Sequence, residues 1–235
     1  MDLNVIVLGP AGSGKSLLTE NFLVYLRDRG YSSVAVNLDT ASPPRYEAFR
    51  DIRDYVKTEE VMDRFQLGIN GALLKSMEIA GSYVDRLAVS GYDFVLYDTP
   101  GQLELFLFSD FGIELIERLE GFTAGLFIVD SSRIKDAARF SAMVSQSATI
   151  SLMLEIPSLT VFNKVDLHVP QSIEKYRSDL ENEGVLGEFF ECLLRFIEVT
   201  SMVYRPVLIS ARNGYGFDDL FSALNELFCA CGDLS

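Results

Sequence analysis

The feature that most constrains this chain is a short glycine-rich stretch, LGPAGSGKS. It follows the apolar run LNVIVL (3–8) and opens a segment whose apolar residues recur at helical spacing. It fits the pattern G-x-x-x-x-G-K-[ST] at Gly9, Gly14, Lys15 and Ser16. In a strand–loop–helix setting, the glycines let backbone N–H groups turn inward around phosphate oxygens, and the helix N-terminus adds a favourable dipole. The sequence therefore predicts a phosphate-binding loop at the first strand-to-helix turn.

The positions of this loop have separate expected tasks. The residues expected to contact nucleotide phosphates are Gly12, Ser13, Gly14, Lys15, Ser16 and Leu17. The Lys15 ammonium group would bridge the β- and γ-phosphates, and the Ser16 hydroxyl group would bind Mg²⁺. The loop indicates a nucleoside triphosphate but identifies neither its base nor its fate, because nucleotide kinases, ATPases and GTPases share it.

Five further apolar runs rich in β-forming residues follow: SVAVNL (33–38), DFVLYD (93–98), AGLFIVD (124–130), LTVF (159–162) and PVLIS (206–210). Several are apolar at nearly every position, as in strands covered by helices on both faces. Helical periodicity begins after Lys15 and recurs at about 71–90, 103–119, 133–154 and 217–229. This alternation predicts an α/β fold with an open, mostly parallel central sheet flanked by helices. Together with the phosphate loop it resembles the three-layer P-loop NTPase fold, with helical insertions.

The length of 235 residues suits one domain, and we expect a single nucleotide-binding domain over 1–235. Two stretches exceed a minimal alternation, at about 43–70 and about 170–204, and both contain mostly helical sequence. Each can be helical cover over a sheet edge. The first can instead be an insertion that faces the active site or a partner.

Composition excludes some function classes. The chain has 34 acidic and 20 basic residues, a formal net charge of -14. A protein that grips a phosphate backbone needs clustered Lys and Arg, so we expect no direct nucleic-acid binding. The longest uncharged run, 140–154, is too short to span a bilayer, and the first strand begins too early to leave room for a signal peptide. We therefore expect a cytoplasmic protein without membrane contact.

Three cysteines, Cys192, Cys229 and Cys231, fit a reducing compartment better than a disulfide framework. With His168 as the chain's single histidine, Cys229 and Cys231 make a poor ligand set for a metal. We expect metal chemistry elsewhere.

The stretch DTPGQ ends the apolar run at 93–98. Asp98 stands at the carboxyl end of that strand, where it would hold the hydration shell of Mg²⁺. The N–H group of Gly101 can then approach the γ-phosphate, and the Gln102 amide can orient an attacking water. A strand ending in a tight turn explains Asp98 and Gly101 separately, but not the whole stretch at this distance after Lys15.

The stretch VFNKVDL indicates the base. We expect the Asp166 carboxylate to accept hydrogen bonds from N1–H and the exocyclic amino group of guanine, whereas adenine presents an acceptor at N1 and no amino group at C2. Polar sites reject mismatched analogues by factors on the order of 10⁴. Asn163 would brace the pocket, and the Lys164 stem would lie along the base. In the later stretch LISAR, the N–H groups of Ser210 and Ala211 would meet the guanine carbonyl oxygen.

In this order the four motifs resemble the signature set of the P-loop GTPases. The resemblance implies binding of GTP and GDP with Mg²⁺, and hydrolysis at the γ-phosphate. The second run continues to VNLDTA, which places Asp39 beside the phosphate loop and resembles the branch of signal-recognition and septum-site ATPases and GTPases. In that branch this carboxylate contacts both the magnesium hydration shell and the attacking water. The resemblance therefore implies that Asp39 binds the metal together with Ser16 and Asp98. It also implies that Asp39 is a catalytic residue, as is Gln102.

The first insertion narrows the resemblance. NLDTA, RYEAFRDIRDYV, LGINGALLKSME and DTPGQLELF, in this order, are similar to the GPN-loop GTPase family over nearly the whole chain. The family's inserted Gly-Pro-Asn tripeptide corresponds to Gly68, Ile69 and Asn70. Family members are homodimers or heterodimers in which each loop reaches the partner's active site. The resemblance therefore implies a homodimer in which Asn70 acts in trans on the transferring phosphoryl group.

Two positions depart from the family pattern: Ile69 replaces proline, and Thr40 stands where proline is common. On the residues alone, Gly68 and Asn70-Gly71 can also be a simple turn, since they tolerate positive φ. Proline would stiffen the loop that positions Asn70, whereas isoleucine holds an extended backbone less strictly. We expect a more mobile loop and slower or more partner-dependent hydrolysis, with the function retained.

Two apolar segments stay ambiguous. Leu105 to Phe108 are four successive bulky apolar residues, which fit either a helix buried on most sides or a dimer surface. The stretch EFFECLLRF fits either core or a docking groove for a client protein.

Several function classes stay open. The first is a GTP-hydrolysing enzyme that depends on Asp39, Gln102 and Asn70. The second is a nucleotide-driven assembly factor with weak or no catalysis; eukaryotic members of the resembled family are associated with RNA polymerase assembly and nuclear import, which implies a protein client. A P-loop kinase is a third, but it needs an acceptor pocket and gives no reason for the Asn-Lys-Val-Asp stretch.

Overall fold

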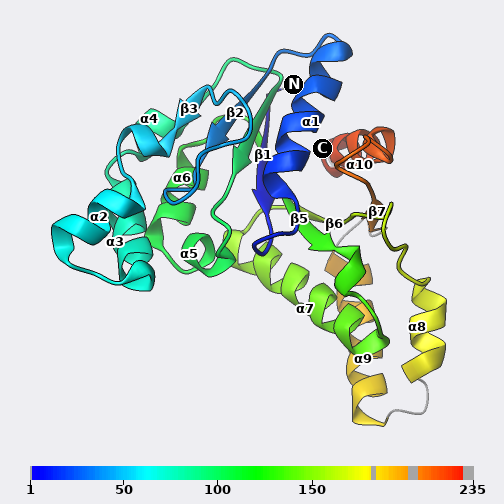
Figure 1. Cartoon of the computed structure of the whole chain (residues 1–235). Coiled ribbons are helices and arrows are strands. Elements are labelled where there is room, and N and C mark those ends of the chain that lie inside the picture. The colour runs from blue at the N-terminus through cyan, green and yellow to red at the C-terminus, as the bar shows by residue number, and fades with distance from the viewer. Residues whose placement is uncertain (1, 181–183, 201–205, 230–235) are drawn as a thin grey trace.

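The computed structural model describes residues 2–180, 184–200 and 206–229. Their strands are β1 (Leu3–Leu8), β2 (Ser33–Asn37), β3 (Arg50–Asp51), β4 (Phe94–Asp98), β5 (Phe122–Asp130), β6 (Ser158–Asn163) and β7 (Val207–Leu208). They form one sheet in the order β3-β2-β4-β1-β5-β6-β7, and every pairing is parallel (Figure 1). The predicted α/β, P-loop type of fold is confirmed.

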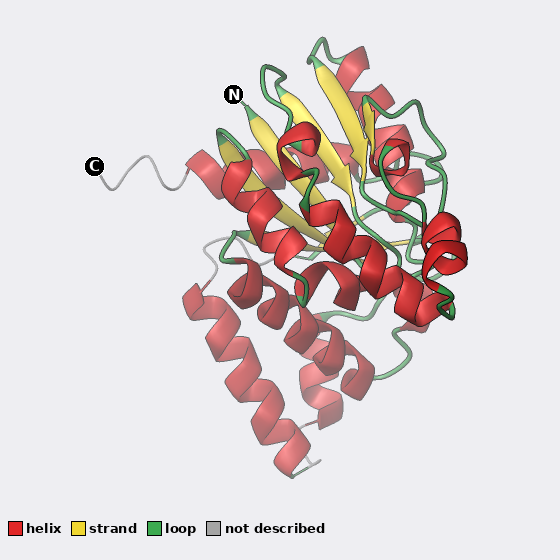
Figure 2. Ribbon diagram, turned by 90° about the vertical axis from the view of Figure 1, so that its left-hand side faces the viewer, coloured by secondary structure: helices red, strands yellow, loops and turns green. Residues whose placement is uncertain are grey.

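Helices lie on both faces of this sheet (Figure 2). They are α1 (Lys15–Asp28), α2 (Thr58–Phe65), α3 (Ile69–Gly81), α4 (Val84–Leu87), α5 (Leu103–Leu107), α6 (Asp110–Arg118), α7 (Ala137–Leu154), α8 (Ile173–Leu180), α9 (Val185–Thr200) and α10 (Phe217–Cys229), with short 3₁₀ turns η1 (Ile52–Asp54) and η2 (Ser131–Arg133). No helix in the described ranges has the length and apolar character that crossing a membrane requires.

Strand β1 shows how the two faces are separated. All six of its residues are buried, and alternate side chains enter different cores. Ile6 and Leu8 pack in the core under α3 to α7, whereas Val5 and Val7 pack in the core under α1 and α10. The period of two in strand side chains therefore explains why the run is apolar throughout.

The first insertion contains an element that its sequence did not predict. Residues 50–51 form β3, which pairs with the end of β2, and α2 follows. The Asn37 side chain, which is buried, donates to the Asp51 carboxylate over 2.8 Å and fixes this pairing. Two residues are too few for a recognisable alternation of apolar and polar positions. The insertion both covers a sheet edge and reaches the strand ends where the motifs lie.

Two predicted helices are each divided. The segment 71–90 becomes α3 and α4, and 103–119 becomes α5 and α6, with Ser109 before α6 in an extended conformation. Gly112 lets α6 pack against α5, because a Cβ atom there would collide with the Phe106 carbonyl oxygen. The last strand is also shorter than 206–210.

The second insertion forms α8 and α9, which extend below the sheet beside α7 (Figures 1 and 2). Phe140 of α7 stacks on Tyr176 of α8 with 4.4 Å between ring centroids, and meets Phe190 of α9 edge-on at 6.1 Å. Residues 201–204 of this predicted insertion, and Cys231, lie outside the described residues. Cys192 is a free, exposed cysteine.

The stretch Leu105–Phe108 is mostly part of the core, and its role as a dimer surface stays a prediction. Leu105, Phe106 and Leu107 are buried, whereas Phe108 is 72% exposed. Phe106 packs edge-on against Phe111 of α6. Three of the four residues therefore belong to the core, and only Phe108 offers an apolar surface.

This difference predicts unequal effects of truncation. Phe106→Ala should lower the free energy of unfolding by about 3–5 kcal/mol, because it leaves a cavity in a packed core. Phe108→Ala should change it by less than about 0.5 kcal/mol. Urea denaturation of both variants measures this difference, and similar losses would contradict the burial assigned to Phe106.

Candidate functional site

The predicted phosphate loop has the backbone that its glycines allow. Gly9, Gly12 and Gly14 have φ values of 148°, 78° and 101°. At Gly14 a side chain is also excluded by space, because a Cβ atom would collide with the Asn163 amide. The N–H groups in the first turn of α1 have no intrahelical acceptors. The Ser13 N–H group donates to the Pro10 carbonyl oxygen over 3.1 Å. The N–H groups at the start of α1 therefore remain as donors that suit phosphate oxygens.

Lys15 lies at the base of this loop. Its ammonium group donates to the Gly9 carbonyl oxygen over 2.9 Å, and its side chain is buried. Burial lowers the pKa of Lys15, while Asp98 and Asp39 act to raise it. A cation so poorly hydrated gains from a phosphate anion, which is consistent with the predicted contact to the β- and γ-phosphates.

Asp98 ends β4 and is almost fully buried. Burial raises its pKa to about 6, against the opposing effects of a hydrogen bond from Ser16 and the charge of Lys15. Within the described structure its Oδ1 atom has no hydrogen-bond partner. A buried carboxylate oxygen without a partner costs free energy that a bound cation would recover.

The groups around Asp98 fit Mg²⁺. Magnesium prefers oxygen ligands, and it is often bound through one or two carboxylates plus substrate phosphates. The Ser16 hydroxyl group lies near enough to Asp98 to lower the pKa of that carboxyl group, and the Asp39 carboxylate lies near enough to act on the charge of Lys15. Ser16, Asp39 and Asp98, predicted separately, are thus brought to one place beside the phosphate loop.

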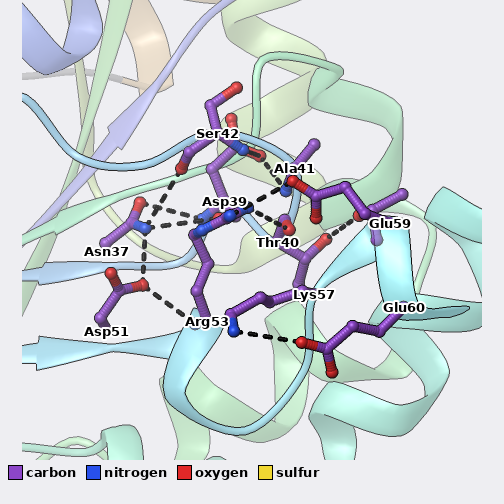
Figure 3. A network of polar contacts seen from close by, with 11 residues as sticks. Asn37, Asp39, Thr40, Ala41, Ser42, Asp51, Arg53, Lys57, Glu59 and Glu60 are labelled. Atoms are coloured by element: carbon purple, nitrogen blue, oxygen red, sulfur yellow. Dashed lines mark hydrogen bonds and ion pairs between the residues drawn. The ribbon is translucent and has the colours of Figure 1, made fainter.

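Asp39 stands in a polar network at the end of β2 (Figure 3). Its Oδ1 atom accepts from the N–H groups of Ala41 and Ser42, over 2.9 and 3.2 Å. Its own N–H group donates to the Asn37 side chain over 3.1 Å. These bonds leave Oδ2 as the carboxylate atom available for a metal-bound or attacking water.

The same network explains how Thr40 replaces a proline. The Thr40 side chain is buried, and its hydroxyl group lies 2.9 Å from that of Thr58 at the start of α2. Its carbonyl oxygen accepts from Arg53 over 2.9 Å and from the Thr58 N–H group over 3.0 Å (Figure 3). Hydrogen bonds to the insertion therefore hold the backbone of this turn. A proline at the same position would instead restrict the backbone through its own ring.

The turn after Asp98 lies directly against the phosphate loop. A Cβ atom at Gly101 would be 3.4 Å from the Cβ atom of Ala11. Thr99 anchors the turn, because its hydroxyl group donates to the Val7 carbonyl oxygen over 2.8 Å. Gln102 follows as the exposed residue before α5, and its side chain does not cap that helix. Its amide is therefore available to a water molecule or ligand.

Asn163 and Lys164 both reach the phosphate loop. The Asn163 amide nitrogen donates to the Ser13 carbonyl oxygen over 2.8 Å. The Lys164 ammonium group donates to the Gly12 carbonyl oxygen over 2.7 Å, and Lys164 itself adopts a left-handed φ of 67°. Asp166 is exposed and lines a cavity of about 200 Å³ together with Ser210 and Tyr215.

The N–H groups of Ser210 and Ala211 are already used within the protein. Ser210 donates to the Tyr215 carbonyl oxygen over 3.0 Å, and Ala211 donates to the Asn163 Oδ1 atom over 2.8 Å. A guanine carbonyl oxygen would therefore share the Ala211 N–H group in a three-centre bond. The proposed base contact of these residues stays a prediction.

The tripeptide at 68–70 is not the flexible turn that its composition suggested. Gly68 precedes α3 with φ -68° and ψ 164°, and Ile69 and Asn70 form the first turn of that helix. The residue with left-handed φ is instead Gln66, at the end of α2. The expected extended backbone at Ile69 is corrected here, because Ile69 is the first helical residue of α3. The expected mobility of the loop stays a prediction.

This geometry also explains the family's proline. The first position of a helix suits proline, since its N–H group has no acceptor in the helix. The residue before a proline must be extended, and Gly68 is. Ile69 thus occupies a backbone conformation that a proline would also adopt.

Two residues near the site were missed by sequence reasoning. The Tyr46 hydroxyl group donates to the Asp98 Oδ2 atom over 3.2 Å, and burial together with the Asp98 charge raises the pKa of Tyr46. The Asp130 carboxylate, at the end of β5, accepts from Lys164 over 2.6 Å. The sequence could have indicated these residues only by their positions. Tyr46 follows Asp39 in the insertion, and Asp130 ends a parallel strand, where α/β sheets bind ligands.

Comparison with known proteins agrees with this geometry. The family described as "Conserved hypothetical ATP binding protein" matches residues 7–230. The GPN-loop GTPase PAB0955 of Pyrococcus abyssi is 33% identical over 98% of this chain and 99% of its own length. This chain belongs to the GPN-loop GTPase family. Its fold matches the apo crystal structure of the same P. abyssi GTPase with a TM-score of 0.76 and 30% identity, covering 97% of this chain and 98% of that one.

A eukaryotic member, GPN-loop GTPase 3 of Danio rerio, is 35% identical over 73% of this chain and 65% of its own length. The relatives are named as GTPases, whereas the family description names ATP, so the two differ in the nucleotide base. The relatives' names agree with the guanine interpretation of Asp166. This GPN-loop GTPase is therefore a GTP-binding protein and a GTP hydrolase.

The raised pKa of Asp98 makes the stability of the metal-free, nucleotide-free GTPase depend on pH. Its usual pKa is 3.8, so a value of about 6 means that the folded protein binds the proton more tightly than the unfolded chain. Stability from this group is present below about pH 4 and is lost as the pH rises through about 6, by on the order of 3 kcal/mol.

Asp98→Asn should remove this loss. In the presence of EDTA at pH 7.5, the variant should melt about 5–10 °C higher than the wild type, and their melting temperatures should converge towards pH 4. Asp63→Asn, an exposed change on α2, is the control and should show no such convergence. A variant that is no more stable at pH 7.5 would contradict the burial cost assigned to Asp98.

Proposed function

We propose that this GPN-loop GTPase hydrolyses GTP in a Mg²⁺-dependent reaction coupled to dimerisation, and that it acts in the cytoplasm as a nucleotide-driven switch in the assembly of a protein complex. In this proposal the phosphate loop and Lys15 hold the β- and γ-phosphates. Ser16 and Asp98 hold the magnesium ion, which would neutralise charge on the phosphates. Asp39 and Gln102 position the water that attacks the γ-phosphate.

The exposure of Asn70 is the observation that carries the coupling to dimerisation. Asn70 lies in the first turn of α3 with an exposed side chain, and within the described structure its amide has no hydrogen-bond partner. Helices α2 and α3 lie at one side of the molecule, beside α5 (Figure 1). The amide is therefore free to act on a second molecule, as the family resemblance implies.

An apolar groove next to α3 also supports a dimer. Leu74 of α3 and Phe108 at the end of α5 are 63% and 72% exposed, and they line a common groove of about 490 Å³. Exposed apolar surface of this kind is typical of association sites. Because α5 begins directly after Gln102, a partner bound here would lie close to the turn at Gly101.

A client protein would need a different surface. A cavity of about 830 Å³ lies between α8 and α9 and is lined by apolar residues, including Leu180 and Phe190, and by charged ones, including Arg177 and Glu191. This is the docking region suggested by the stretch EFFECLLRF. It supports an assembly role, in which hydrolysis resets the conformation of the complex.

The mass of the protein in solution tests the coupling directly. We expect a dimer with Mg²⁺ and a non-hydrolysable GTP analogue, and a larger monomer fraction with GDP. Light scattering at matched concentrations measures this, alongside the steady-state hydrolysis rate as a function of protein concentration. A hydrolysis rate per molecule that stays constant while the protein dissociates would contradict the proposal.

Asp166→Asn should change base preference. The amide can donate where xanthine carries an oxygen, so the variant should prefer xanthosine triphosphate, while its affinity for GTP should fall by roughly 10²–10⁴-fold. Competition binding with the two nucleotides measures this preference. An unchanged GTP affinity would contradict the base contact assigned to Asp166.

Asn70→Ala should slow hydrolysis on the order of 100-fold, since it removes one donor to the transition state, and should leave GDP affinity nearly intact. Ile69→Pro is the matched control, because the local backbone already suits proline; its hydrolysis rate should stay equal to or above that of the wild type. Single-turnover hydrolysis compares them. An unchanged hydrolysis rate in Asn70→Ala would show that Asn70 has no role in hydrolysis and that the segment only begins a helix.

A further inference from the structure

A carboxylate outside the predicted motifs holds the region between β5, β6 and the phosphate loop. Asp130 ends β5, and only 7% of its side chain is exposed. Its Oδ2 atom accepts from the Lys164 ammonium group over 2.6 Å. Its Oδ1 atom accepts from the N–H and hydroxyl groups of Ser132, over 3.0 and 2.6 Å.

Every group bonded to Asp130 donates a hydrogen bond, so both Oδ1 and Oδ2 must act as acceptors. An asparagine has nearly the same shape, but its amide nitrogen would face either the Lys164 ammonium group or the Ser132 N–H group, and neither can accept a hydrogen bond. Burial alone would raise the pKa of Asp130, yet the bonds from Lys164 and Ser132 hold it below its usual range. These bonds therefore favour the charged form of the carboxylate.

Lys164 depends on this contact for its position. Its backbone has a left-handed φ of 67° and is held by the Asn163 side chain, which accepts from the Lys164 N–H group over 2.8 Å, so it is the side chain of Lys164 that needs a further anchor. Its ammonium group then bonds to two acceptors, the Gly12 carbonyl oxygen over 2.7 Å and Asp130. Without Asp130, one neutral carbonyl oxygen would be left to hold a long, flexible side chain.

We propose that Asp130 is a positioning residue for nucleotide binding, which acts by holding Lys164 across the phosphate loop. The inference rests on the proposed nucleotide site, where the Lys164 stem lies along the base. A Lys164 held at Gly12 joins the base-binding end of β6 to the phosphate-binding loop, so both halves of the site are in place before the nucleotide arrives. Loss of Asp130 separates the two halves, and bound nucleotide leaves faster.

Arg133 does not share this role. Its Nε atom lies 3.8 Å from the Asp130 Oδ2 atom, and its side chain is 66% exposed, so it forms a weak ion pair at the surface. The short contact and the loop carbonyl both belong to Lys164. The effect of Asp130 on the nucleotide is therefore expected to pass through one partner.

A double-mutant cycle on GDP affinity tests this. Asp130→Asn should weaken GDP binding about 10-fold in the wild-type background, the loss expected for one hydrogen bond to a charged group. In a Lys164→Met background, the same change should weaken it less than about 2-fold, since the partner is already gone. Asp130→Ala, which places no new donor opposite Lys164, should repeat this pattern. Titration of a fluorescent GDP analogue gives the affinities, and stopped flow gives the dissociation rates.

Asp136→Asn is the control, because it removes the same charge from an exposed carboxylate at the start of α7 and should leave GDP affinity unchanged. Equal losses from Asp130→Asn in both backgrounds, or no loss in either, would overturn the role of Asp130. The proposed nucleotide site would stand in that case. A wild-type protein that fails to bind GDP would instead overturn both.

Discussion

The side chain of Asn163 joins three loops on which the site depends. Its amide nitrogen donates to Ser13 in the phosphate loop, and its oxygen accepts from the N–H groups of Lys164 and Ala211, each over 2.8 Å. The amide is buried, so none of these bonds competes with bulk water. Gly14 must lack a side chain for the approach. The phosphate-binding and base-binding regions are thereby fixed relative to each other, and the dipeptide at 210–211 is tied to both.

The parallel sheet explains why the remaining polar groups gather beside these loops. Strands β1, β2, β4, β5 and β6 run in the same direction, so their carboxyl ends share one edge of the sheet. Asp98, Asp130 and Asn163 each end a strand there, although they lie far apart in the sequence. Because apolar residues cover both faces, this edge is the place where charged groups can meet water, a cation and a phosphate.

Much of this was predictable, because strand runs and glycine loops leave strong local patterns. The phosphate loop and the positions of Asp39 and Asp98 at strand ends follow from motif order. The sequence also assigned Asn163 a bracing role, but its contact with Ser13 of the phosphate loop emerged only from the structure. What was missed depends on contacts between distant segments. The two residues of β3 exist because Asn37 and Asp51 pair, and Tyr46 meets Asp98 only after the insertion folds back. The helical start at Ile69 was misjudged, because glycine and asparagine suit a turn and a helix N-terminus equally well.

The insertion also gives a physical connection between the hydrolysis site and Asn70. Thr40, directly after Asp39, is bonded to Thr58 at the first residue of α2 and to Arg53. Helix α2 packs on α3, which carries Asn70 in its first turn and packs in turn against α5, directly after Gln102. In the proposed mechanism, a partner that moves α3 would therefore act on both turns that are expected to position the attacking water. At position 40 the turn is thus held by contacts between the strand end and the insertion.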